Sequence, residues 1–133
     1  MLPDKTLTYI SLFSSAGVGC YGFKQAGFEC IATNELIERR LKIQKINNKC
    51  KKSTGYIKGD ITKNEIKELI FSEIKKWEKE GNDKVDVVIA TPPCQGMSVA
   101  NHKKTANEIV RNSLVVESIE IVKKIKPGFF VFE

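Results

Sequence analysis

The sequence places a cysteine directly after two prolines. Cys94 follows Pro92 and Pro93, which end the apolar run 84–90. Proline has no backbone N–H and fixes its own φ, so the run cannot continue as a strand and the loop is stiff. A stiff loop can hold an attacking atom in position, and a thiol is an intrinsically strong nucleophile. Cys94 is therefore the candidate nucleophile. The alternative is a small apolar filler, which is the role expected of the other three cysteines.

Small residues and two acids follow the first three apolar runs. The turn 14–22 is rich in serine, alanine and glycine, which lets a cofactor approach the backbone, although it fits the GxGxxG phosphate motif only nominally. Glu35 suits hydrogen bonding to both hydroxyls of a ribose, or it complements a helix dipole. Asp60 suits a hydrogen bond from an adenine amino group. Alternatively, Asp60 or Thr62 caps the next helix. Because strand ends share one rim, these features favour an adenosine-bearing cofactor.

Five apolar runs alternate with helical patterns. The expected strands cover 7–13, 29–34, 54–60, 84–90 and 128–133, and the expected helices cover 63–80 and 108–126. The residues expected to face the core from these helices are Ile66, Leu69, Ile70, Ile74, Trp77, Ile109, Val115, Val116, Ile119, Val122 and Ile125. Strands that alternate with helices form a parallel sheet covered on both faces. The sequence therefore predicts an α/β fold with a doubly wound, mostly parallel sheet.

The last expected strand is too apolar for a free sheet edge. Its sequence at 129–132 is FFVF, and unpaired backbone groups beside such side chains invite aggregation. Either another polypeptide completes the sheet, or the chain is part of a longer protein. The sheet is therefore predicted to be incomplete.

The length and composition of the chain limit its domain count, its relation to membranes and its expected ligands. A chain of 133 residues forms at most one domain, and no run approaches the roughly 20 apolar residues of a membrane span. The four cysteines have no CxxC pair and no metal-ligand spacing, so reduced thiols in a cytoplasm are expected and a metal is not. Between 38 and 58 stand eight Lys or Arg and one acid. This basic block indicates a polyanionic partner or an ordinary solvated helix face.

Six short motifs resemble, in order, the first six motifs of the cytosine-5 DNA methyltransferases. They are LFSSAGVG (12–19), NE (34–35), GDIT (59–62), PPCQGMS (92–98), RNSL (111–114) and FE (132–133). The resemblance covers essentially the whole chain, 8–133. One departure is that the family's Asp-Leu-Phe-x-Gly reads Ser11-Leu12-Phe13-Ser14-Ser15 here, which weakens the expected contacts to the methionine end of the cofactor. The family's target recognition region and last motif have no counterpart.

The resemblance implies a chemistry for individual residues. Cys94 would add to carbon 6 of a cytosine flipped out of double-stranded DNA, and Glu133 would bond to ring nitrogen 3, aided by burial that keeps it partly protonated. Gln95 and Ser98 would lie beside the flipped nucleotide, and Arg111 would brace the loop after the nucleophile. S-adenosylmethionine would be converted to S-adenosylhomocysteine. The positions matching the family's cofactor contacts are Phe13, Ala16, Gly17, Val18, Glu35, Leu36, Asp60, Ile61, Pro93 and Leu114.

The predicted function is that of the amino-terminal catalytic part, residues 1–133, of a bacterial DNA (cytosine-5)-methyltransferase of the restriction–modification type. It would be a truncated enzyme or one half of a split enzyme, needing a second chain or a missing carboxyl-terminal part. Two alternatives stay open: a non-catalytic S-adenosylmethionine-binding subunit that acts by assembly, and an RNA cytosine-5 methyltransferase of the same family. An NAD-dependent dehydrogenase is disfavoured because a proper GxGxxG is lacking.

Overall fold

The computed structural model of the chain describes residues 5–93 and 106–133, and the side chains of 5–93 and 113–133. The strands are β1 (Thr8–Leu12), β2 (Glu29–Glu35), β3 (Tyr56–Lys58), β4 (Val87–Ala90) and β5 (Phe129–Phe132). They form one sheet in the order β3-β2-β1-β4-β5, and every neighbouring pair is parallel. The five predicted strands and the doubly wound α/β fold are confirmed.

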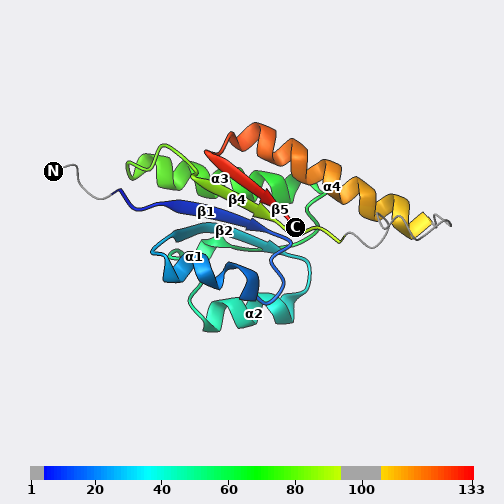
Figure 1. Cartoon of the computed structure of the whole chain (residues 1–133), viewed down its shortest axis with the longest axis horizontal. Coiled ribbons are helices and arrows are strands. Elements are labelled where there is room, and N and C mark those ends of the chain that lie inside the picture. The colour runs from blue at the N-terminus through cyan, green and yellow to red at the C-terminus, as the bar shows by residue number, and fades with distance from the viewer. Residues whose placement is uncertain (1–4, 94–105) are drawn as a thin grey trace.

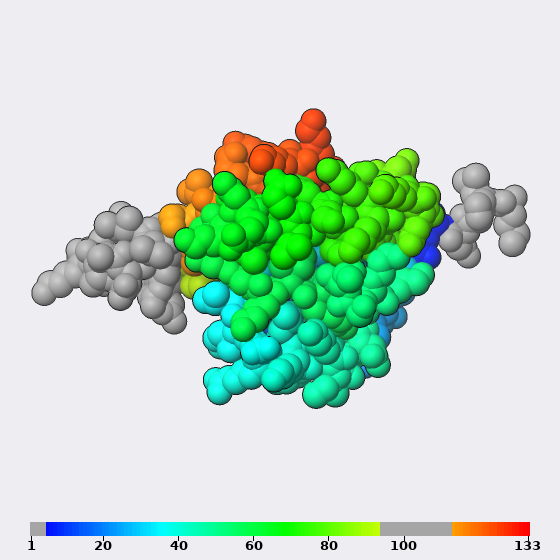
Figure 2. All heavy atoms as spheres, turned by 180° about the vertical axis from the view of Figure 1, so that it is seen from behind, coloured from blue at the N-terminus to red at the C-terminus, as the bar shows by residue number. Residues whose placement is uncertain are grey.

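Helices cover both faces of the sheet. They are α1 (Tyr21–Gln25), α2 (Glu38–Ile46), α3 (Asn64–Lys79) and α4 (Ala106–Ile125), with short 3-10 turns at Val18–Cys20 and Ser53–Gly55. Figure 1 shows α1 and α2 on one side of the sheet and α3 and α4 on the other. From behind, α3 (green) lies on one side and α2 with the segment leading to β3 (cyan to teal) on the other (Figure 2).

Two apolar cores result from this layering. The larger lies beneath α3 and α4 and includes Ile10 of β1, Val88 of β4 and Trp77 of α3. The smaller lies beneath α1 and α2, where the rings of Tyr9 and Phe23 stack at 5.0 Å. This smaller core also holds three free, buried cysteines, Cys20, Cys30 and Cys50.

The smaller core shifts the pKa of several acidic side chains, and Tyr9 and Cys50 are two of them. Burial raises the pKa of the Tyr9 hydroxyl. The pKa of the Cys50 thiol is raised by its hydrogen bond to Cys30, with 3.6 Å between the sulfur atoms, and then by burial. Both groups are therefore held in their neutral forms by the fold.

The predicted core face of α3 needs one correction. Ile66, Ile70 and Trp77 are buried, but Leu69 is 50% exposed. The buried stripe advances by four, three and four residues through Glu73, which leaves Leu69 about 70° from the centre of the stripe. The Glu73 carboxylate accepts hydrogen bonds from Thr54 Oγ1 at 3.0 Å and from Lys76 Nζ at 2.7 Å, which explains how a charged side chain occupies this stripe.

The predicted core face of α4 is wrong in part. Val116 is 58% and Ile119 is 40% exposed, whereas Ser118, Ile121 and Val122 are buried. Because a serine lies on the buried face of α4, apolar spacing alone does not identify that face. Its hydroxyl donates to the Leu114 carbonyl at 2.8 Å, so the polar group carries no unmet hydrogen bond. Ile109 lies among the side chains outside the described set.

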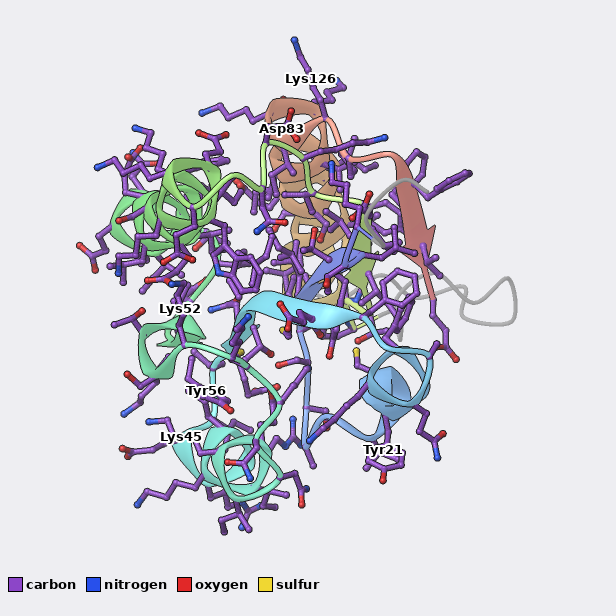
Figure 3. The ribbon with its side chains drawn as sticks, turned by 90° about the vertical axis from the view of Figure 1, so that its left-hand side faces the viewer. Tyr21, Lys45, Lys52, Tyr56, Asp83 and Lys126 are labelled. Atoms are coloured by element: carbon purple, nitrogen blue, oxygen red, sulfur yellow. The ribbon has the colours of Figure 1, made fainter. Side chains whose placement is uncertain are left out.

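The basic block 38–58 includes α2 and is partly neutralised within the chain. Three of its lysines pair with acids at 2.5 to 3.4 Å: Lys51 with Glu29, Lys52 with Glu80 and Lys58 with Glu38. Lys45 lies over the Tyr56 ring at 5.7 Å, as Figure 3 shows from the amino ends of the strands. These contacts favour the interpretation of the block as a solvated surface.

Candidate cofactor cavity

A cavity of about 510 Å³ opens at the carboxyl ends of the strands. Its walls come from the end of β2, from the loops after β1, β2, β3 and β4, and from one residue each of α2 and α4. The sheet order reverses direction between β1 and β4, and ligands of doubly wound sheets bind at such a point. Seven of the ten predicted cofactor positions line this cavity: Phe13, Glu35, Leu36, Asp60, Ile61, Pro93 and Leu114.

Glu35 is the buried acid of the cavity, with 5% of its surface exposed. Its Oε2 accepts the Ser15 N–H at 2.7 Å, and its Oε1 accepts the Ile37 N–H at 3.0 Å. Arg40 Nη1 lies 3.9 Å from Oε1. These groups stabilise a carboxylate that burial alone would destabilise. Each oxygen has a second lone pair for a ligand hydroxyl, and the bond to Ile37 also satisfies an amide at the start of α2.

Asp60 lies at the exposed rim of the cavity. Its Oδ1 accepts the Thr62 N–H at 2.9 Å and the Thr62 hydroxyl at 2.8 Å. These bonds, the backbone one first, lower the pKa of the Asp60 carboxyl. The alternative in which Asp60 or Thr62 caps α3 is wrong, because the cap residue is Lys63 and it makes no side-chain cap bond. Asp60 therefore stabilises a turn before the helix and carries its charge at the cavity rim.

The loop after β1 has an unusual backbone. Phe13 and Ser15 both have positive φ, 54° and 51°, and Gly17 follows with φ 86°. Ser15 stands where the resembling family has glycine, the residue that adopts this conformation without steric cost. Ser11, in place of the family's aspartate, is buried with its Oγ 3.2 Å from Cys20 Sγ, and it does not line the cavity.

Three predicted positions are not brought into this cavity. Ala16, Gly17 and Val18 line a separate cavity of about 210 Å³, together with Lys24 and Lys49 among others. The left-handed turn redirects the chain after Ser15, and Val18 is 80% exposed. A run of small residues cannot reveal such a change of direction. Contact of these three residues with a cofactor stays a prediction.

The loop after β4 brings the prolines to two different surfaces. Pro93 lines the 510 Å³ cavity, whereas the buried Pro92 lines an apolar groove of about 530 Å³ beside β5. Thr91 connects this loop to the loop after β1, because its Oγ1 donates to the Phe13 carbonyl at 2.9 Å. Cys94 follows Pro93 directly in the sequence. Cys94, Gln95 and Ser98 themselves lie outside the described residues, and Arg111 belongs to α4 with its side chain outside the described set.

Glu133 lies beside the loop that carries the prolines. Its N–H donates to the Ala90 carbonyl at 3.1 Å, and it lines the apolar groove near Pro92. The side chain is exposed. The burial expected to favour a protonated Glu133 is therefore not provided by the described part of the chain.

Several cavity residues were not predicted. Ser15 and Thr91 line the wall, and Arg40 approaches the buried acid from the first turn of α2. Arg40 stands out in the sequence only as one cation of the basic block. An arginine in the first turn of a helix that follows a strand-end acid is the signal that would have found it. Among the described residues, no group of three or more His, Cys, Asp or Glu could hold a metal ion, and no helix is long and apolar enough to cross a membrane.

Comparison with known proteins decides the family. Residues 7–133 match the C-5 cytosine-specific DNA methylase family. The chain is a member of this family. The methylase chain is 35% identical over 133 residues to the type II methyltransferase M1.HgaI of Avibacterium volantium, covering 97% of the chain and 34% of that protein. It is 33% identical over 124 residues to the type II methyltransferase M.AquIA of Picosynechococcus, covering 93% of the chain and 46% of that protein.

A solved structure agrees with the methylase fold. A crystal structure described as a DNA modification methyltransferase encoded within an Escherichia coli prophage superposes with a TM-score of 0.67 at 27% identity. The alignment covers 96% of the chain and 31% of that protein. The chain thus spans about a third of the length of the first relatives that it matches. The resemblance drawn from the short motifs is confirmed.

Proposed function

We propose that the chain is the cofactor- and cytosine-binding part of a bacterial DNA (cytosine-5)-methyltransferase of a type II restriction–modification system, acting in the cytoplasm. One observation carries the proposal. Residues from five separate motifs surround a single cavity at the switch point of the sheet, and the last wall residue before the candidate nucleophile is Pro93. Such convergence of distant strand ends is the usual origin of binding sites in this fold class.

The cavity residues fit S-adenosylmethionine. The Glu35 carboxylate, already fixed by two N–H groups, would accept the two ribose hydroxyls, and Asp60 would accept the adenine amino group. Leu36, Ile61 and Leu114 would supply apolar contacts to the adenine ring. Phe13 would lie towards the methionine end. The cofactor would supply an electrophilic methyl group on a sulfonium.

Cys94 and Glu133 would perform the chemistry on the cytosine. The Cys94 thiolate forms a bond to carbon 6 of the flipped base, and the ring electron pair moves so that carbon 5 becomes nucleophilic. Glu133 donates a hydrogen bond to ring nitrogen 3 and stabilises the charge that develops there. After carbon 5 has taken the methyl group, its proton leaves to a base, and the returning electron pair expels Cys94.

We expect the described chain to act together with a further part of the enzyme. Its relatives are about three times longer. Two residues of β5 are also exposed, Phe129 by 75% and Phe130 by 61%. We propose that the rest of the enzyme, in the same or a second polypeptide, pairs with β5 and supplies the region that reads the DNA sequence. It would also bury Glu133.

Two measurements test the proposed function. Calorimetry on the chain should give binding of S-adenosylmethionine and S-adenosylhomocysteine and no binding of NAD. The enzyme completed with its remaining part should form a covalent adduct with a 5-fluorocytosine DNA duplex, and Cys94→Ser should abolish that adduct. Binding of NAD alone would overturn the cofactor assignment. An adduct that survives Cys94→Ser would overturn the nucleophile assignment, and methylation of RNA in preference to DNA would overturn the substrate.

A further inference from the structure

Gln44 is a buried amide that the mechanism above does not use. It lies on α2 and is 1% exposed, although this helix is polar and basic. It does not line the 510 Å³ cavity. A buried amide without partners is strongly destabilising, so its contacts indicate what it is for.

The side-chain hydrogen bonds of Gln44 join α2 to the loop after β1 and to the neighbouring strand β2. Its Nε2 donates to Ser14 Oγ at 2.8 Å and to the carbonyl of Ser15. Its Oε1 accepts the hydroxyl of the fully buried Thr33 of β2 at 2.7 Å. Lys49 Nζ in turn donates to Thr33 Oγ1 at 3.1 Å. The amide therefore connects the loop to two elements of the rigid fold.

Both backbone polar groups of Ser15 form hydrogen bonds to buried side chains. Its carbonyl accepts from Gln44, and its N–H donates to Glu35 Oε2 at 2.7 Å. Between these two bonds the residue has φ 51°, a conformation that a residue with a Cβ avoids. The turn also packs closely on Gln44, since a Cβ added at Gly17 would lie 3.1 Å from Gln44 Cγ.

We propose that Gln44 is a positioning residue for the cofactor cavity. It keeps Ser15 in the left-handed conformation, which aims the Ser15 N–H at Glu35 and keeps Phe13 at the cavity wall. Glycine would need no such support, so Gln44 compensates for serine at a position where the resembling family has glycine. If the amide were lost, Ser15 would relax to negative φ and Glu35 would lose one of the groups that fix it. The inference rests on the proposed function, because it concerns the same cavity.

The test is the substitution Gln44→Met, which keeps length and apolar contacts and removes the hydrogen bonds. We expect the affinity of the chain for S-adenosylmethionine, measured by calorimetry, to fall at least tenfold. Ser15→Gly in the Gln44→Met background should restore the affinity to within threefold of the wild type, since glycine adopts positive φ unaided. The matched control is Gln25→Met, the same substitution at an exposed position of α1, which should leave the affinity unchanged.

The rescue separates a positioning role from a merely structural one. A structural role would lower the stability of Gln44→Met, and Ser15→Gly could raise the stability without restoring the affinity. That result, or wild-type affinity in Gln44→Met, would overturn the inference and leave the proposed function intact. If Gln44→Met does not fold, Thr33→Val removes the hydroxyl that anchors the amide, and its loss of affinity should also be rescued by Ser15→Gly. A wild-type chain that binds no S-adenosylmethionine would overturn the proposed function and the inference together.

Discussion

Replacing Ser15 by glycine should make the protein more stable. Ser15 has φ 51°, and a residue with a Cβ loses about 1–2 kcal/mol in the left-handed region. Glycine removes this cost, but it loses about 0.5–1 kcal/mol more conformational entropy on folding. The Ser15 side chain is exposed, so little packing is lost. Taking the middle of each range, the expected net gain is about 0.75 kcal/mol in the free energy of unfolding.

Thermal unfolding followed by circular dichroism measures this gain. The unfolding entropy is roughly 2.1 cal/mol/K per residue, so for 133 residues the gain corresponds to an increase in Tm of about 2–4 °C. The control is Ser53→Gly, the same substitution at an exposed residue whose φ is not positive. There only the entropy term acts, and the Tm should fall by a similar amount. Equal changes of Tm in the two variants would refute the reasoning from backbone strain.

Three further outcomes are expected. Burial raises the pKa of Tyr9, so the unfolded chain releases this proton at lower pH than the folded chain does. Urea titrations should show the full contribution of this group to stability below about pH 9 and its progressive loss through about pH 10 and above. Gly55→Ala would place a Cβ 2.7 Å from the Ile31 carbonyl oxygen and should lower the free energy of unfolding by about 1–3 kcal/mol; an unchanged urea midpoint would contradict this. Phe130→Lys removes an exposed ring from the open edge of β5 and should reduce self-association in light scattering; equal association would show that this edge is not responsible.

The fold was predictable where apolar periodicity carries the information. The run 84–90 predicts β4 because a central parallel strand is apolar on both faces, and β4 is buried throughout. Helix α2 could not be predicted with bounds, because only Leu41 and Gln44 are buried on it and one of the two is polar. The face of α4 was misassigned for the same reason, since Ser118 lies on the buried side.

The candidate site was predictable where strand ends fix the position of a side chain. Glu35 and Asp60 follow β2 and β3 and lie around one cavity, as expected for neighbouring parallel strands. The loop after β1 was not predictable in the same way. Its course depends on the backbone torsions at Ser15 and Gly17 and on a hydrogen bond from a distant glutamine, and neither is visible in a run of small residues.

The two prolines that precede Cys94 lie between the apolar groove beside β5 and the cavity that holds Glu35. Pro92 forms part of the wall of the apolar groove beside β5, and Pro93 forms part of the wall of the cavity that holds Glu35. Each proline has a fixed φ, and Pro93 also restricts the conformation of Pro92, so the two rings have few orientations relative to each other. A chain segment that fills the groove would contact Pro92, which is joined through Pro93 to Cys94. Assembly at the edge of the sheet, as proposed above, would then affect the position from which Cys94 begins.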